Sequence, residues 1–290
     1  MARQLDQVAH FARYAEQLGA ESLWVGDRVL AAVNPTVGYG GSDTIPWQMN
    51  ALLDPFVALS VAATATERVR LGTSTLVAPW YPPLLLARSL AGVDVVSEGR
   101  LIAGLGTGWS PDEFQGVGVP WAERGARLDE CLDVLETVWA KDPVEPHRGK
   151  HFSFPAAHIG PKPVQRPRPP VFLSAFTRVS QRRAARRGDG ILPAVSTYPG
   201  SAFDPAAMVA RPLEQVRRSA ENEGRDPAAL SAILRINPAA ESSVDAVVDV
   251  ILRTRDTTDV DHVFVDLVYL VDQGVEQALD MLQRTLEMAR

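Results

Sequence analysis

The chain has few of the features that mark secreted, membrane-bound or nucleic-acid-binding proteins. Its 290 residues include one cysteine, Cys131, so an internal disulfide is excluded and this side chain is expected in the core. No apolar stretch is long enough to span a bilayer, and no apolar signal region opens the chain. The formal net charge is −6, without the basic clustering of a nucleic-acid surface. We therefore expect a cytoplasmic protein with a small-molecule substrate, and neither nucleic acid nor membrane as a partner.

Several common catalytic motifs are also missing. The chain contains neither the Gly-x-Ser-x-Gly sequence of serine hydrolases nor the Gly-x-Gly-x-x-Gly fingerprint of nicotinamide-binding folds. His147 and His151 are four residues apart, but Pro146 and Gly149 argue against one helix that carries both. No metal site is expected. The remaining candidates for chemistry are glycines and polar residues that follow predicted strands.

Apolar periodicity predicts alternating helices and strands along the whole chain. Helices are predicted at residues 3–18, 55–66, 82–96, 121–141, 178–187, 205–223, 243–254 and 274–289. Strands are predicted at residues 22–25, 69–77, 101–105, 170–175, 190–195, 230–236 and 262–270. This alternation implies parallel strands joined by right-handed crossovers, and we expect one TIM-type (β/α)8 barrel domain over residues 1–290.

Two features depart from a regular barrel. The chain begins with a helix where the barrel needs a strand, so we expect a gap between the strands at 22–25 and 262–270. A recorded sequence that starts late is favoured over a fold that tolerates the gap, because the gap leaves unpaired strand edges. Residues 142–169 contain seven prolines and interrupt the alternation. They are interpreted as an insertion loop over the barrel mouth.

The most informative stretch is residues 99–118. A short apolar strand over 101–105 ends in Gly106, Thr107 and Gly108, and Ser110 then opens a helical turn. Glycines at this place let a flat or anionic ligand approach the backbone, and a helix start offers free N–H groups to an anion. The alternative interpretation is an ordinary tight strand-to-helix turn.

Three other segments support a functional interpretation of this stretch. They are Ser-Leu-Trp-Val-Gly-Asp-Arg at 22–28, Val-Arg-Leu-Gly-Thr-Ser-Thr-Leu-Val at 69–77 and Glu-Arg-Gly-Ala-Arg-Leu-Asp-Glu at 123–130. In this order and spacing the chain resembles the luciferase-like monooxygenase superfamily, and within it the branch that uses the deazaflavin coenzyme F420. The resemblance runs from about Leu5 to the C-terminus. It implies a luciferase-like barrel, a homodimer, and hydride transfer to or from a deazaflavin.

The resemblance also implies where the cofactor binds. Ligands of such barrels lie at the C-terminal ends of the strands. A cis, non-proline peptide is implied between Ser74 and Thr75, in a bulge against the deazaflavin ring. The turn at 174–177 is implied to hold the cofactor phosphate, although alanine and phenylalanine stand there in place of the glycines common in relatives. The implied cofactor-binding residues are Asp27, Ser74, Thr75, Gly106, Thr107, Gly108, Ser174, Ala175, Phe176 and Thr177.

Arg28 and Trp109 are the candidates for catalytic roles. Arg28 stands where relatives often have histidine, and a guanidinium cannot act as a base at neutral pH. We expect it to hold an anionic substrate or to stabilise a reduced cofactor; alternatively, it pairs with Asp27 or Asp43 to order the long loop. Trp109 stands where some relatives carry a glutamate proton donor, and we expect it to shape an apolar pocket. For Asp27 the alternative is a carboxylate that braces a loop.

Three functions remain open at this point. The first is hydride transfer between F420 and an unidentified organic substrate, and the second is a monooxygenase that uses reduced FMN and oxygen. The third is a cofactor-binding protein without turnover, which the missing histidine, glutamate and strand would favour. A homodimer is expected to form through the helices at 55–66 and 82–96. The side chains expected at that contact are Ala58, Ala62, Ala63, Leu84 and Leu85.

Overall fold

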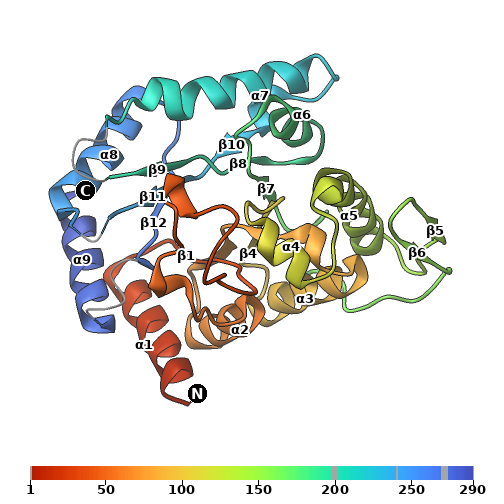
Figure 1. The fold of residues 1–290 in the computed structure, drawn as a ribbon, viewed down its shortest axis with the longest axis horizontal. Helices are drawn as coiled ribbons and strands as arrows, with labels where there is room; N and C mark the ends of the chain where they lie inside the picture. The colour runs from red at the N-terminus through yellow and green to blue at the C-terminus, as the bar shows by residue number, and fades with distance from the viewer. Residues whose placement is uncertain (1, 198–201, 240, 269–273, 290) are drawn as a thin grey trace. The chain divides into compact units, whose positions relative to one another are not determined.

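Helices and strands alternate through the computed structural model, which describes residues 2–197, 202–239, 241–268 and 274–289 (Figure 1). The chain separates into two compact units. We call residues 1–24, 68–70 and 171–290 the terminal unit, and residues 25–67 and 71–170 the central unit. The single-domain organisation expected from the sequence stays a prediction.

The central unit is built around the buried strand β4. Its helices are α2 (Pro55–Ala65), α3 (Pro83–Val96), α4 (Pro111–Gly116) and α5 (Arg124–Ala140), and its strands are β2 (Arg70–Thr73, shared with the terminal unit), β3 (Leu76–Val77), β4 (Leu101–Gly106), β5 (His147–Arg148) and β6 (Ser153–Phe154). Every residue of β4 is buried, and β4 pairs in parallel with both β2 and β3. The apolar run that predicted this strand therefore lies in the middle of the core. Cys131 on α5 is also buried, as expected.

The strand predicted at 69–77 is interrupted at Ser74 and Thr75. Gly72 and Leu76 are four residues apart, whereas their partners on β4, Ile102 and Leu105, are three apart. One extra residue is therefore accommodated between β2 and β3, which is a bulge. The Ser74–Thr75 peptide is cis, which confirms that expectation.

Local capping explains where two central helices begin. The Asp54 carboxylate accepts hydrogen bonds from the backbone N–H groups of Phe56 and Val57 at 2.9 and 3.0 Å, and Pro55 occupies the first turn of α2. Ser110 is the N-cap of α4 and accepts from the Glu113 N–H. Both starts agree with the sequence prediction.

The insertion at 142–169 contacts the helices and does not lie over the strand ends. Its β5–β6 hairpin is held by Glu130 of α5, which accepts from the N–H groups of His151 and Phe152 at 2.9 and 2.8 Å (Figure 1). Further along, the fully buried Asp94 of α3 accepts from the N–H groups of Val164 and Gln165. The predicted position over the barrel mouth is therefore wrong, because these two carboxylates bind the backbone of the segment.

The terminal unit contains the remaining elements. Its helices are α1 (Ala2–Leu18), α6 (Arg178–Arg187), α7 (Arg211–Glu221, preceded by a π-helical turn at Ala206–Ala210), α8 (Val244–Thr257) and α9 (Val275–Met288). Its strands are β1 (Ser22–Val25, whose last residue belongs to the central unit), β7 (Val171–Leu173), β8 (Gly190–Ile191), β9 (Ala194–Ser196), β10 (Ser231–Ala232), β11 (Leu234–Asn237) and β12 (Val263–Val265). Strand β8 pairs in parallel with β7 and β10, and β11 pairs in parallel with β9 and β12.

Two predicted strands of this unit are each split in two. The stretch at 190–195 forms β8 and β9, and the stretch at 230–236 forms β10 and β11. The first split falls at Leu192 and Pro193, and proline has no N–H to continue a ladder. After it the partner changes, because β8 pairs with β7 and β10 whereas β9 pairs with β11. Residues 269 and 270 of the last predicted strand lie outside the described residues.

Strands β1 and β12 contact each other through side chains at the place where the sequence predicted a gap. Within the described residues no ladder joins them. Trp24 stacks on Phe264 with ring centroids 4.3 Å apart, and Ser22 Oγ lies 2.8 Å from His262 Nε2. Burial lowers the pKa of His262 to about 4, so this imidazole is neutral near pH 7. None of the described helices combines the length and the apolar character that crossing a membrane requires.

Candidate functional site

Three strand ends of the central unit converge around Val77. Val77 on β3 is the register partner of Gly106 at the end of β4, and its N–H donates to Asp27 Oδ2 at 2.9 Å. Gly108 has a φ of +69°, and a Cβ on it would lie 2.7 Å from Val77 Cγ1. A side chain at 108 is therefore excluded by both conformation and space. Gly106 is buried, whereas Thr107 and Gly108 are partly exposed, so a ligand would reach this turn at 107–108.

The Asp27 carboxylate is half-buried and bound by neutral donors. Besides the Val77 N–H, the Tyr81 hydroxyl donates to it, 3.0 Å from Oδ1 and 3.1 Å from Oδ2. Burial raises the pKa of Asp27 to about 6, and repulsion from Asp54 adds to this, while the two hydrogen bonds oppose it. Burial and the neighbouring Asp27 also raise the pKa of the Tyr81 hydroxyl.

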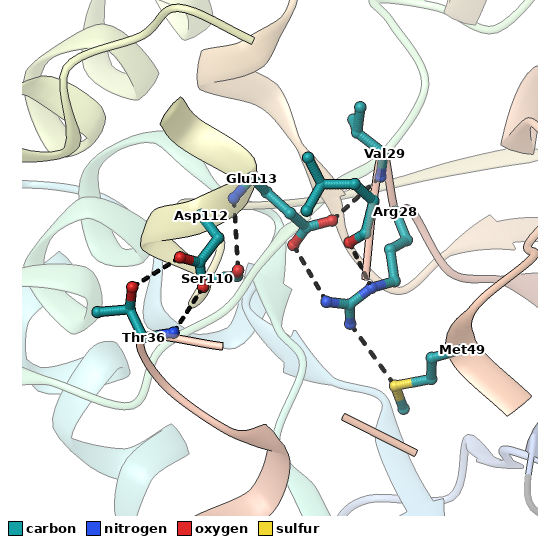
Figure 2. Close-up of polar contacts among 8 residues, drawn as sticks. Arg28, Val29, Thr36, Met49, Ser110, Asp112 and Glu113 are labelled. Atoms are coloured by element: carbon teal, nitrogen blue, oxygen red, sulfur yellow. Dashed lines mark hydrogen bonds and ion pairs between the residues drawn. The ribbon is translucent and has the colours of Figure 1, made fainter. Parts of the chain in front are cut away.

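The next residue, Arg28, lies in a closed environment. Its side chain is 5% exposed, and its Nη2 lies 3.7 Å from Glu113 Oε2. Nε donates to the Leu30 carbonyl at 2.9 Å, and Nη1 lies 3.6 Å from the Met49 sulfur (Figure 2). The guanidinium also lies 4.9 Å from the centre of the Trp109 ring. The positive charge of Arg28 is therefore balanced inside the protein.

Glu113 supplies the negative half of this pair. It lies in the first turn of α4, its side chain is 3% exposed, and its Oε1 accepts from the Val29 N–H at 3.0 Å (Figure 2). Burial raises the pKa of Glu113, and the Arg28 charge and the backbone N–H groups of Val29 and Leu30 act in the opposite direction. One carboxylate thus binds both the side chain of Arg28 and the backbone that follows it.

A second, exposed carboxylate fastens the same loop to α4. Asp112 accepts from the Thr36 N–H at 2.9 Å and from the Thr36 hydroxyl at 2.6 Å (Figure 2). These hydrogen bonds lower the pKa of Asp112. The ring of Tyr39 packs edge-on against Trp109 at 5.4 Å. The loop between β1 and α2 is therefore attached to α4 and to Trp109 at several points.

The predicted phosphate-binding turn belongs to the terminal unit, between β7 and α6. Thr177 is the N-cap of α6 and forms a capping box with Ser180. Ala175 is buried, whereas Phe176 is 68% exposed. Ser174 precedes them in the same turn. The structure describes this group within its own unit, separately from the residues around Val77.

Comparison with known proteins places the chain in a family. Residues 1–284 match the family model described as "Luciferase-like monooxygenase". The chain belongs to this family. An F420-dependent glucose-6-phosphate dehydrogenase of Amycolatopsis mediterranei (strain U-32) is 31% identical over 189 residues, which are 64% of this chain and 52% of the relative. An FMNH(2)-dependent dimethylsulfone monooxygenase of Pseudomonas putida is 30% identical over 188 residues, 64% of this chain and 47% of the relative.

The fold agrees with this family membership. An F420-dependent secondary alcohol dehydrogenase in complex with an F420-acetone adduct superposes with a TM-score of 0.74 at 16% identity, over 97% of this chain and 94% of that one. A long-chain alkane monooxygenase gives 0.75 at 14% identity, over 98% of this chain and 84% of that one. These likenesses show the α/β barrel fold of luciferase-like enzymes. The alignments with the curated relatives cover 39 to 64% of those proteins' own length.

The candidate site includes two residues, Glu113 and Tyr81, that were not among the site residues predicted from the sequence. In the sequence, Glu113 is marked only as an acidic residue in the first turn of a predicted helix, and no pattern marks Tyr81. The alternative role considered for Arg28 named Asp27 or Asp43 as its partner, and the structure shows Glu113 instead. Asp27, Gly106 and Gly108 lie in the central unit next to Val77, while Ser74 and Thr75 form the bulge between β2 and β3.

Proposed function

We propose that this luciferase-like protein is an oxidoreductase that transfers a hydride between coenzyme F420 and a small organic substrate. The observation that carries the proposal is the group that Val77 brings together, the Asp27 carboxylate and the turn at 106–108 that ends β4. Thr107 and Gly108 are partly exposed, and a planar ring would lie against this part of the turn. Relatives that use F420 support the choice of cofactor. When bound, F420 would supply the hydride chemistry.

The chain's own residues would position the cofactor and exclude water. We propose that one group contacts the ring and that the turn before α6 holds the phosphate. The ring group is Asp27, Ser74, Thr75, Gly106, Thr107 and Gly108, and the phosphate group is Ser174, Ala175, Phe176 and Thr177. Trp109 would form an apolar wall, and Arg28 would stabilise negative charge on substrate or reduced cofactor while Glu113 keeps it in place.

The second candidate is a monooxygenase that uses reduced FMN and oxygen, favoured by the dimethylsulfone monooxygenase relative. Fluorescence titration of the purified protein with F420 and with FMN separates the two. We expect saturable quenching by F420 and weaker binding of FMN. Preferential binding of FMN would favour the monooxygenase, and F420 binding without turnover on any substrate would favour a cofactor carrier. A cytoplasmic location stays a prediction.

Gly106→Val is expected to weaken F420 binding at least about a hundredfold, or about 2.7 kcal/mol, because the added side chain occupies the space of the ring. Gly92→Val in α3 is the control, since an added Cβ there meets no atom within 4 Å. Circular dichroism should show both variants folded. Equal affinities for F420 in the two variants would contradict the position proposed for the ring.

We also propose that two copies pair through α2 and α3. Val57 and Leu85 are 43% and 48% exposed on these helices. Ala58, Ala62 and Ala63, which were expected to contribute, are buried within the chain and do not offer surface. Light scattering at micromolar concentration should give a dimer for the parent protein and a monomer for Leu85→Glu. A monomeric parent protein would refute the pairing.

A further inference from the structure

Where the small organic substrate of the proposed function is an alcohol, its oxidation releases one proton besides the hydride. The C–H bond would break with its electron pair, which bound F420 would take up as hydride, and the O–H bond would break as the carbonyl forms. A positioned base must accept that proton. Arg28 cannot, because a guanidinium stays protonated at neutral pH. The base must therefore come from another residue near these strand ends.

Four carboxylates lie in this part of the central unit, and three of them already have a structural role. Glu113 is 3% exposed and faces Arg28. Asp112 accepts two hydrogen bonds from Thr36. Asp54 accepts two backbone N–H groups at the start of α2. These three carboxylates hold Arg28, the loop between β1 and α2, or the start of α2.

Asp27 differs from them in exposure and in partners. It is half-buried just after the C-terminal end of β1, and it accepts hydrogen bonds from a tyrosine hydroxyl and one backbone N–H. The Tyr81 hydroxyl bridges both oxygens, 3.0 and 3.1 Å away, and so fixes the plane of the carboxylate. Val77, the register partner of Gly106, holds it beside the turn that ends β4.

We propose that Asp27 accepts the substrate hydroxyl proton during oxidation and returns it during reduction, with Tyr81 as its positioning residue. The inference rests on the proposed function. In the oxidation direction the proton moves from the substrate oxygen to an Asp27 oxygen and then to water. In the reverse direction the same group protonates the oxygen that forms as the carbonyl accepts a hydride.

The charges around Asp27 suit this role. Burial raises its pKa to about 6, close to the pH at which a base works near neutrality. The charge of Asp54, at the start of α2, adds to the rise in the pKa of Asp27, and the charge of Asp27 in turn adds to the rise in the pKa of Glu113 on α4. Tyr81 is the titratable group in direct contact with Asp27. The hydrogen bond from Tyr81 favours the carboxylate, so its loss should move the Asp27 pKa upward.

The first test measures the free protein and needs no substrate. With ¹³C-labelled aspartate, the Asp27 carboxyl resonance, assigned by its loss in Asp27→Asn, should titrate with a midpoint near pH 6. Tyr81→Phe should raise this midpoint by about one unit. Asp112→Asn is the control and should leave it unchanged. A midpoint near 4 in the parent protein, or no shift in Tyr81→Phe, would overturn the inference.

The second test measures turnover with 2-propanol and F420 as the probe pair. Asp27→Asn should lower kcat at least about a hundredfold, a loss clearly larger than any loss of F420 affinity measured by quenching on the same variant. The pH at half-maximal rate should rise in Tyr81→Phe by the same amount as the resonance midpoint. A full rate in Asp27→Asn would overturn the role of Asp27 and leave hydride transfer standing. Failure of the parent protein to bind F420 would instead overturn the proposed function, whatever the titration shows.

Discussion

Glu113→Ala is expected to lower the free energy of unfolding by about 3–5 kcal/mol, the usual cost of removing one partner of a buried ion pair. The Arg28 guanidinium, in a side chain 5% exposed, would be left without its counter-charge, and the Val29 N–H would lose its acceptor. Urea denaturation at pH 7 measures the loss. Because burial raises the pKa of Glu113 above its unfolded value, the folded state binds this proton more tightly, so the titration of this group should make the parent protein more stable as the pH falls toward that pKa.

The matched control is the neighbouring residue. Asp112→Ala removes an exposed carboxylate that binds the same loop through Thr36, and we expect a much smaller loss of stability than for Glu113→Ala. The double variant Arg28→Met, Glu113→Leu should recover much of the stability lost in Glu113→Ala, since no buried charge remains unpaired. Equal losses for Glu113→Ala and Asp112→Ala would show that the pair contributes no more than a surface contact.

Arg28→Ala separates the two roles considered for this arginine. If Arg28 only orders the loop, the variant melts at a lower temperature and binds F420 as the parent protein does. If its charge also acts on cofactor or substrate, F420 affinity falls as well. Melting temperature and quenching measured on the same sample distinguish these outcomes.

Asp94→Ala is the second large effect, with an expected loss of about 3–5 kcal/mol in the free energy of unfolding. Asp94 is fully buried and accepts from the Val164 N–H at 2.6 Å, the Gln165 N–H at 3.1 Å and Gln165 Nε2 at 2.7 Å. Removal takes a fully buried acceptor away from three partly buried donors, and each lost hydrogen bond to a charged group costs about 1.5–3 kcal/mol. The insertion at 142–169 should then become sensitive to limited proteolysis.

Asp142→Ala is the control, at the other end of the same insertion. Asp142 accepts from the Ile159 N–H and contacts His158, but its side chain is 46% exposed. We expect a much smaller loss of stability than for Asp94→Ala and no new proteolytic site. If Asp94→Ala lost as little stability as Asp142→Ala, the insertion would be held by its apolar contacts and not by the buried carboxylate.

Local signals in the sequence predicted the positions of most helices and strands. Asp54 and Pro55 specify the start of α2 because a capping carboxylate and a fixed φ act within one turn. The apolar run of β4 predicted a buried strand for a similar reason, since a strand covered on both faces has no polar side. The resemblance to luciferase-like proteins predicted the cis peptide at Ser74–Thr75, which periodicity alone would have missed.

The candidate site was predictable only in part. Gly106, Gly108 and Asp27 were found because each directly follows a predicted strand, and parallel strands bring such residues to one edge. Glu113 and Tyr81 were not found, because each becomes meaningful through a partner far away in the chain: Glu113 binds the Val29 N–H across 84 residues and Tyr81 binds Asp27 across 54.

By itself, then, the sequence determined the α/β alternation, the luciferase-like family, and the glycines and carboxylate at the strand ends. These properties are encoded within a few residues, in side-chain periodicity, capping and missing Cβ atoms. Only the tertiary structure decided that Arg28 pairs with Glu113, that Asp94 holds the insertion against α3, and where the strands at 190–195 and 230–236 break. Burial, charge balance and strand partners depend on packing between distant segments, and local pattern does not specify that packing.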